Sequence, residues 1–148
     1  MSFRWLIFFL GVSAGLAAPA DRQTVLIEPA KTSIYIGSVT LTMPPFSRVQ
    51  DRYESTYAAK VFPYFFYNEH GRLSITFTDE QLDRLARGER VEFKGAGLSS
   101  DGEDRRIEGA ATPSDVTSGK IKVRVFVSKK IELIFNTTYR FAPAPPAK

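Results

Sequence analysis

The sequence predicts a mainly β domain, either an antiparallel β-sandwich or a small barrel, with one short helix. Three features of the 148-residue chain support this prediction. Apolar and polar residues alternate with period two through several short segments, turn-forming residues separate those segments, and a helix-capping pattern occurs once. A series of short strands with frequent turns is typical of both architectures.

The clearest β-structure lies in residues 120–141. Lys120, Lys122 and Arg124 alternate with apolar residues, so one face of a strand is cationic and the other apolar. After a polar break at residues 128–130, the chain is rich in β-branched and aromatic residues up to residue 141. Two such runs around a short break predict an antiparallel hairpin, which we expect at the centre of the sheet.

Two further strands are predicted before residue 44. Thr24–Ile27 is a short strand that is halted by Pro29. Within Ser33–Met43, the apolar positions change from even to odd numbers near Gly37. Because side chains alternate strictly across a strand, such a slip would turn half of it inside out, and we expect a bulge or bend at Gly37.

The middle of the chain predicts a second hairpin and the helix. Ser55–Phe62 and Arg72–Phe77 are the strands of the hairpin, and residues 68–71 have the composition of its turn. Thr78 and Gln81 form a capping box, which predicts a short helix over residues 79–87, ended by a glycine. We expect this helix to cover one end of the sheets.

The strands predicted over Arg90–Leu98 and Arg105–Thr112 are joined by a turn at residues 99–104. They bring the count to eight or so short strands with one helix. An immunoglobulin-like sandwich is the favoured architecture, as an analogy of shape only, and the small barrel is the alternative. Fold alone does not determine function.

Residues 1–20 have the features of a secretory signal peptide. Arg4 precedes a short apolar run, and small residues lead to a cleavage site after Ala18 or Ala20. An uncleaved anchor is the alternative, but the apolar run is shorter than a membrane-spanning helix. We therefore expect a secreted or periplasmic protein with a signal peptide over 1–20, a single β-domain over 21–141 and a flexible Ala/Pro-rich tail over 142–148. No later segment is apolar enough for a transmembrane helix.

Composition argues against several classes of function. The formal net charge of +4 is a mild surplus, and no nucleic-acid partner is expected. The absence of cysteine excludes disulfides, thiolate metal sites and cysteine nucleophiles. His70 is the only histidine and lies in a predicted turn, which argues against a serine-histidine triad.

The acidic residues Asp101, Glu103 and Asp104 are interpreted as a charged turn, with a weak calcium site as the alternative. Paired carboxyl groups for glycoside hydrolysis are not evident in this loop. We expect no enzyme activity, no metal and no cofactor.

Two groups of residues are candidates for binding. Tyr64, Phe65, Phe66 and Tyr67 form a dense aromatic run, and clustered exposed rings bind partners or stack on sugars. The favoured interpretation is that at least one of these rings packs in the core, because neighbouring residues of a strand face opposite sides.

The second candidate is the cationic stripe, defined as Lys120, Lys122 and Arg124. It could meet an anionic envelope polymer or lipid headgroups. The favoured interpretation is an ordinary solvated strand face, on which lysines also discourage edge-to-edge pairing.

These observations predict an exported, non-enzymatic β-domain that acts by binding or structural association at the cell envelope or outside the cell. Its expected partner is a protein or a glycan. A carbohydrate-binding module that uses Tyr64–Tyr67 is the first alternative. A small hydrolase, or a barrel that holds an apolar ligand, is the second.

Overall fold

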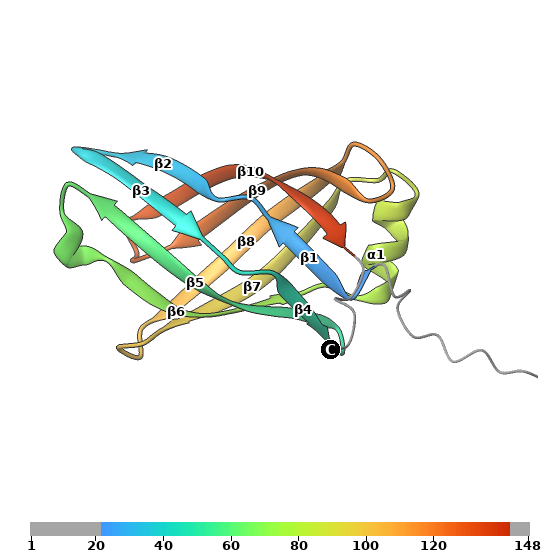
Figure 1. Cartoon of the computed structure of the whole chain (residues 1–148), viewed down its shortest axis with the longest axis horizontal. Coiled ribbons are helices and arrows are strands. Elements are labelled where there is room, and N and C mark those ends of the chain that lie inside the picture. Colours follow the sequence, from blue (N-terminus) through green and yellow to red (C-terminus); the bar gives the residue numbers. More distant parts are fainter. Residues whose placement is uncertain (1–21, 143–148) are drawn as a thin grey trace, which may run out of the picture.

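The computed structural model describes residues 22–142, which form a closed antiparallel β-barrel with one short helix (Figure 1). The strands are β1 (Thr24–Ile27), β2 (Ala30–Ile34), β3 (Gly37–Thr42), β4 (Phe46–Val49), β5 (Arg52–Phe62), β6 (Glu69–Thr76), β7 (Val91–Ser99), β8 (Asp104–Pro113), β9 (Ser118–Phe126) and β10 (Glu132–Ala142). A 3-10 turn, η2 (Phe65–Tyr67), joins β5 to β6, and α1 (Asp79–Ala86) joins β6 to β7.

The predicted signal peptide and all but the first residue of the predicted tail lie outside the described residues. Ala142, the first residue of that tail, belongs to β10 and pairs with Thr24.

The ten strands occupy eight positions around the barrel. β5 pairs with β3 along one half of its length and with β4 along the other, so β3 and β4 follow one another at one position. β1 and β2 share another position, where Glu28, between them, still forms hydrogen bonds with Thr137 and Thr138 of β10. Prolines lie at both breaks, Pro29 and Pro44–Pro45, since proline cannot donate to a strand ladder.

Each barrel position pairs with the next along the chain, and β1 pairs with β10 to close the sheet. The barrel alternative is therefore confirmed, and the immunoglobulin-like sandwich is not formed. A sandwich requires connections that pass between two separate sheets. Here each barrel position connects to the neighbouring position, so a twisted meander curls until its first and last strands meet.

The hairpin predicted over residues 120–141 is confirmed as β9 and β10, which pair from Ser118 with Arg140 to Phe126 with Glu132. It forms part of the barrel wall, between β8 and β1.

The phase slip near Gly37 is a chain reversal and not a bulge within one strand. β2 and β3 are joined by two residues, and Ile34 pairs with Gly37. Paired residues of antiparallel strands share a face, so even positions of β2 face the same way as odd positions of β3. Gly37 has φ of +125°, and a Cβ there would lie 1.9 Å from the carbonyl oxygen of Phe62.

The hairpin of β5 and β6 is confirmed, but its turn lies earlier than predicted. Glu69, His70 and Gly71 belong to β6 and pair with residues 57–59 of β5. The reversal takes place over residues 63–68, which include η2.

The helix α1 begins as predicted, at a capping box. The backbone N–H of Gln81 donates to Thr78 Oγ1 at 3.2 Å, and the backbone N–H of Thr78 donates to Gln81 Oε1 at 2.7 Å. Leu82 and Leu85 are buried at one end of the barrel. Arg48 Nη2 also bonds to Asp79 Oδ1 at 2.8 Å, which ties the start of the helix to β4. This end of the barrel is therefore closed.

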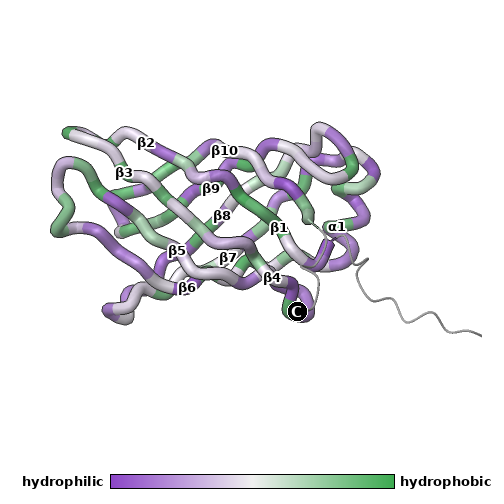
Figure 2. Tube along the Cα trace, viewed as in Figure 1, coloured by the Kyte–Doolittle hydropathy of each residue, from purple (hydrophilic) through white to green (hydrophobic). Residues whose placement is uncertain are grey.

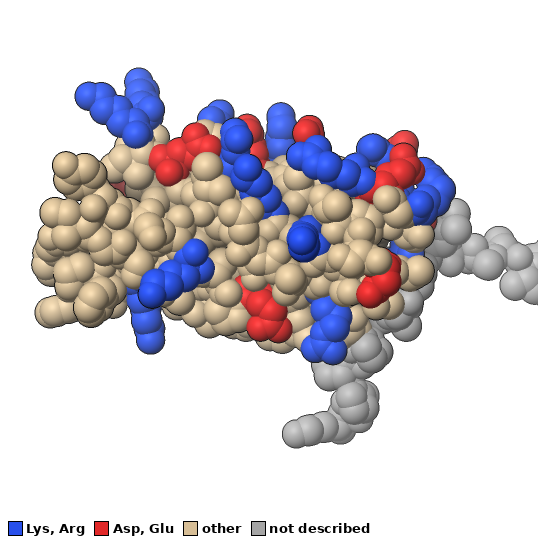
Figure 3. Space-filling model, turned by 90° about the horizontal axis from the view of Figure 1, so that it is seen from above, with Lys and Arg blue, Asp and Glu red and all other residues tan. Residues whose placement is uncertain are grey.

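The outer wall of the barrel is polar, and its inner wall is largely apolar. In β9, Lys120 and Lys122 are exposed, whereas Ile121 between them is buried. Figure 2 shows polar and apolar residues interleaved along the strands, and Figure 3 shows charged side chains distributed over the wall. The period-two alternation predicted from the sequence is thus the inside-outside alternation of a barrel.

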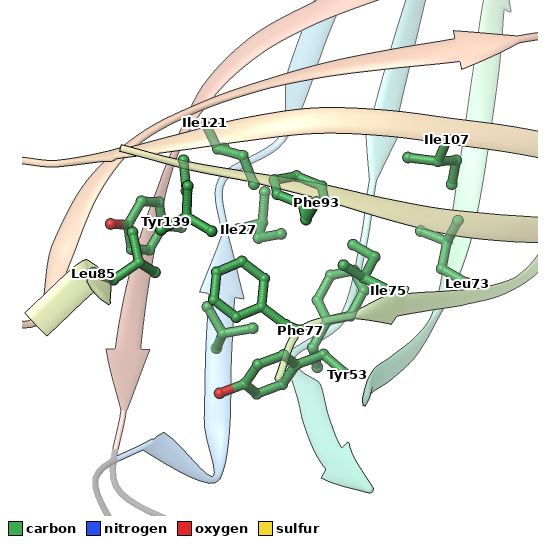
Figure 4. Packing of buried hydrophobic residues seen from close by; sticks show 14 of the residues in the cluster. Ile27, Tyr53, Leu73, Ile75, Phe77, Leu85, Phe93, Ile107, Ile121 and Tyr139 are labelled. Atoms are coloured by element: carbon green, nitrogen blue, oxygen red, sulfur yellow. The ribbon is translucent and has the colours of Figure 1, made fainter. Parts of the chain in front are cut away.

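Aromatic rings fill the half of the barrel nearest α1. Tyr53, Phe77 and Phe93 point toward one another from different parts of the wall (Figure 4), with ring centroids of Phe77 and Phe93 6.0 Å apart. Phe46 and Val91 are the largest fully buried side chains. Only about 40 Å³ remains free among these residues. This half of the barrel is a packed core.

Replacing Phe46 by alanine should lower the free energy of unfolding by about 3–5 kcal/mol, because loss of the buried ring leaves a cavity in a tightly packed core. Urea unfolding of the full-length chain measures the change. Phe65→Ala is the matched control, since that ring is exposed on η2. Its replacement should change stability by less than about 0.5 kcal/mol. Equal losses for the two variants would contradict the assignment of Phe46 to the core and Phe65 to the surface.

Candidate functional site

The half of the barrel away from α1 contains a cavity of about 1080 Å³. Four connections surround its mouth: the β2–β3 turn, the β5–β6 segment with η2, the β7–β8 turn and the β9–β10 turn. The helix α1 lies at the opposite end, so we refer to this end as the open end (Figure 1).

The cavity exists because the inward side chains of this half are small. The closed half projects phenylalanine and tyrosine rings inward. The corresponding positions around the cavity carry mainly aliphatic or small residues, including Ala30, Val39, Ala59, Val61, Gly97 and Val123. Eight strands enclose an interior that side chains can just fill. Smaller side chains at the inward positions leave room for a ligand.

A polar cluster of Tyr57, Glu69 and Arg105 lies in the wall of this cavity. Arg105 Nη2 donates to Glu69 Oε1 at 2.8 Å, and Arg105 Nε donates to Glu69 Oε2 at 3.4 Å. The hydroxyl of Tyr57 donates to Glu69 Oε2 at 2.6 Å. Arg105 Nη1 also donates to the carbonyl oxygen of Val127 at 3.2 Å. All three residues line the cavity.

Gly97 allows the two ends of this cluster to meet. Arg105 lies on β8 and Glu69 on β6, with β7 between them. Gly97 is the residue of β7 that pairs with Arg105. A Cβ at Gly97 would lie 3.3 Å from the Cβ of Arg105 and 3.3 Å from Leu73 Cδ2. The missing side chain therefore leaves a path over β7, along which the long arginine side chain reaches Glu69.

The cluster combines a carboxylate, a guanidinium and a neutral phenol. Partial burial acts to raise the pKa of the Glu69 carboxyl, but hydrogen bonds from Arg105 and Tyr57, together with the arginine charge, hold that pKa below its usual value. Burial and the hydrogen bond to Glu69 raise the pKa of the Tyr57 hydroxyl. The Arg105 and Glu69 side chains are 16% and 23% exposed. Their charges cancel, so the cavity wall offers hydrogen-bonding groups with little net charge.

The predicted aromatic run does not pack in the core. Phe65, Phe66 and Tyr67 are 75%, 67% and 68% exposed. The interpretation that at least one ring of Tyr64–Tyr67 lies in the core is wrong, because this segment is a 3-10 turn beyond the end of the sheet. The rings pack on one another, with centroids of Phe66 and Tyr67 4.6 Å apart. Tyr64, Phe66 and Tyr67 contribute to the mouth of the cavity.

Further apolar side chains surround the same mouth. We define the aromatic rim as Tyr35, Ile36, Phe62, Phe65, Phe66 and Tyr67, all of which are exposed. These are six of the eleven large apolar side chains that are exposed within the described range, so exposed apolar surface is concentrated at the open end.

The cationic stripe lies on the outer wall of β9 and takes no part in lining the cavity. Lys120, Lys122 and Arg124 are exposed, as the alternation predicted. Arg124 Nε lies 3.4 Å from Glu132 Oε1, and Arg124 pairs across the sheet with Glu108. The stripe therefore runs beside carboxylates that offset part of its charge.

His70 is exposed on β6, and its backbone carbonyl accepts a hydrogen bond from the backbone N–H of Ser100 in the β7–β8 turn at 2.9 Å. Within the described range, no three His, Cys, Asp or Glu side chains are grouped in a way that could hold a metal ion. None of its helices is long and apolar enough to cross a membrane.

The polar cluster was not predicted from the sequence. Glu69 was expected in a turn, and the acidic residues before Arg105 were expected to form a charged turn. One signal was available: Arg105 shares its parity with Ile107 and Ala111, which face the interior. An arginine on the apolar face of a strand requires a buried partner. The identity of that partner depends on the tertiary structure.

Comparison of the chain with protein-family models, with curated proteins and with solved structures gave no match.

The Glu69→Gln variant should be less stable than the natural protein by about 1–3 kcal/mol near pH 7, because Arg105 loses its partly buried partner. A carboxyl with a lowered pKa stabilises the fold above its unfolded pKa, and this contribution is lost as the pH falls through the folded value. The difference between the two proteins should therefore shrink below about pH 4.3. Urea unfolding between pH 3 and pH 7 measures it.

Glu89→Gln is the control, since Glu89 forms only exposed ion pairs with Arg84 and Arg87 near α1. It should change stability by less than about 0.5 kcal/mol across this range. A stability difference for Glu69→Gln that grows toward acid pH would contradict the lowered pKa.

Proposed function

We propose that this protein is a non-enzymatic binding protein that holds one small amphipathic molecule inside the barrel. The observation that carries the proposal is the cavity of about 1080 Å³, open at one end and closed by a packed core at the other. Binding sites for small molecules typically measure about 300–1,000 Å³ and are mostly apolar with a few placed polar groups. The volume of the cavity is close to the upper limit of this range, and its lining is mostly apolar with a few polar groups.

The apolar part of the ligand would contact the aliphatic wall. Burial of apolar surface contributes about 25 cal/mol per Å², so a hydrocarbon chain supplies most of the affinity at such a wall. The small residues Ala59, Val61 and Val123 leave the width that a chain requires.

The polar part of the ligand would contact Tyr57, Glu69 and Arg105. Because the charges of Glu69 and Arg105 already neutralise one another, an added charge would disturb a satisfied pair. A head group that is neutral when bound, such as a hydroxyl or a glyceryl ester, can donate to the carboxylate and accept from the guanidinium. We therefore favour a neutral single-chain lipid, of which a monoacylglycerol is the model compound.

Export from the cytoplasm, which residues 1–20 predict, belongs to the same proposal. It would place the barrel in the periplasm or outside the cell, where molecules with long apolar chains need a carrier to cross water.

Carbohydrate binding by Tyr64–Tyr67 is the second candidate, and the exposure of the rings favours it. Their geometry favours it less. The planes of Phe65 and Phe66 meet at 72° and those of Phe66 and Tyr67 at 50°, so the rings offer no single flat platform. Retention of the protein on polysaccharide affinity gels, with no displacement of an apolar probe from the cavity, would favour this candidate instead.

The Ala59→Phe variant should bind an apolar ligand at least tenfold more weakly, because the added ring occupies cavity volume. The measurement is the fluorescence of N-phenyl-1-naphthylamine bound to the full-length chain, followed by displacement with monoolein. Ala59 faces the cavity, and Ala58 is its neighbour on the opposite face of β5.

Ala58→Phe is thus the matched control and should bind like the natural protein. Absence of probe binding to the natural protein, or equal effects of the two variants, would contradict a ligand site inside the barrel.

A further inference from the structure

We propose that the open end of the barrel docks on a lipid bilayer that contains anionic lipid, with the aromatic rim inserted among the headgroups. Docking would place the cavity mouth against the bilayer, so that a ligand could pass between the two without crossing water. The exchange of ligand rests on the proposed function, whereas the docking surface does not.

The first argument is the concentration of apolar surface at one end. Exposed apolar patches on proteins mark contact with partners or membranes. Phe62, Phe65 and Phe66 are each more than half exposed, and Tyr67 adds a ring with a polar tip. Phenylalanine and tyrosine are suited to the region between acyl chains and water. Figure 2 shows apolar positions at the tip of β2–β3 and in the η2 segment.

The second argument is the shape of the open end. The β2–β3 turn, with Tyr35 and Ile36, and the η2 segment project furthest along the long axis of the molecule (Figure 1). The face seen in Figure 3 has an uncharged tip at this end, with lysine and arginine side chains beside it. An uncharged tip flanked by cations is complementary to the apolar interior of a bilayer bordered by anionic headgroups.

The charges around the mouth determine how the barrel would be oriented. Lys129 and Lys130 lie exposed in the β9–β10 turn next to the exposed Ile131, and Lys60 is exposed two residues before Phe62. The β7–β8 turn is acidic, with Asp101, Glu103 and Asp104, and it is set back from the tip in Figure 1. The β2–β3 turn lies on the opposite side of the mouth. Docking centred on the β2–β3 turn brings its two neighbours around the mouth, η2 and the β9–β10 turn, toward the bilayer and keeps the acidic turn in water.

A bilayer fits this surface better than a protein does. Tyr35, Ile36 and Phe66 border the cavity mouth as well as forming the rim. A protein partner or a second copy seated on them would cover the mouth and seal an apolar cavity. A bilayer would instead connect the cavity to a phase in which amphipathic ligands dissolve.

The test uses tryptophan as a depth probe in the full-length chain. Trp5 is the only tryptophan, so Trp5→Phe combined with Phe66→Trp carries a single probe at the rim. Trp5→Phe combined with Val116→Trp is the matched control, since Val116 is an exposed apolar residue between β8 and β9, at the closed end. Vesicles of phosphatidylcholine and phosphatidylglycerol with brominated acyl chains quench tryptophan that enters the bilayer.

We expect the emission of the Phe66→Trp protein to shift to the blue and to fall at least twofold on these vesicles. The Val116→Trp protein should show neither change, even if residues 1–20 also bind the vesicles. Equal quenching of both probes, or no quenching of the rim probe, would overturn the docking proposal.

The charge contribution is tested separately. Lys129→Glu with Lys130→Glu, in the rim-probe protein, should raise the lipid concentration at half-maximal quenching about tenfold, since basic residues near an anionic surface add to binding. Lys120→Glu with Lys122→Glu reverses two charges of the cationic stripe and should leave that concentration within about twofold. A larger effect from the stripe than from the β9–β10 turn would overturn the proposed orientation.

Three outcomes separate docking on lipid from self-association and from the proposed ligand site. If the aromatic rim pairs with a second copy, the protein elutes as a dimer that Phe66→Ser dissociates, the rim probe stays unquenched, and docking on lipid is refuted. If the natural protein binds and releases N-phenyl-1-naphthylamine normally but the rim probe is never quenched, docking fails while the proposed ligand site stands. If the rim probe is quenched but N-phenyl-1-naphthylamine does not bind, docking stands and the proposed ligand site fails.

Discussion

The pairing of β1 with β10 is the interaction on which the rest of the structure depends. Four residues of β1, Thr24–Ile27, join the first barrel position to the last and remove both free edges of the sheet. Closure gives every strand an inside and an outside, and the period-two pattern then separates apolar from charged side chains. Without this pairing the sheet would have no interior, and neither the packed core nor the cavity would exist.

The second determinant is the uneven volume of inward side chains along the barrel axis. Near α1, rings such as Phe46, Phe77 and Phe93 fill the interior almost completely. Toward the open end, alanine, valine and glycine leave a large cavity. One half supplies the burial that stabilises the fold, which permits the other half to remain unfilled. The part of the barrel that stabilises the fold and the part that contains the cavity therefore follow one another along the barrel axis.

The polar cluster shows how an apolar cavity can hold charged groups. Glu69 and Arg105 are 36 residues apart in sequence, and they meet because Gly97 on the intervening strand has no side chain. Two hydrogen bonds between opposite charges, and a third from Tyr57, offset the cost of partial burial. The cluster supplies donors and acceptors in a wall that otherwise recognises only apolar surface, and this combination underlies the proposed preference for an amphipathic ligand.

Local interactions were readable from the sequence alone. Alternation marked the strands, Thr78 and Gln81 marked the start of α1, and the alternating lysines marked an outer face, because each depends on residues a few positions apart. Closure, the cavity and the exposure of Phe65 and Phe66 were decided only by the tertiary structure. They depend on which strand edges meet, on the summed volume of side chains from eight barrel positions, and on where the β5–β6 segment leaves the sheet. None of these quantities is a property of any one segment of the chain.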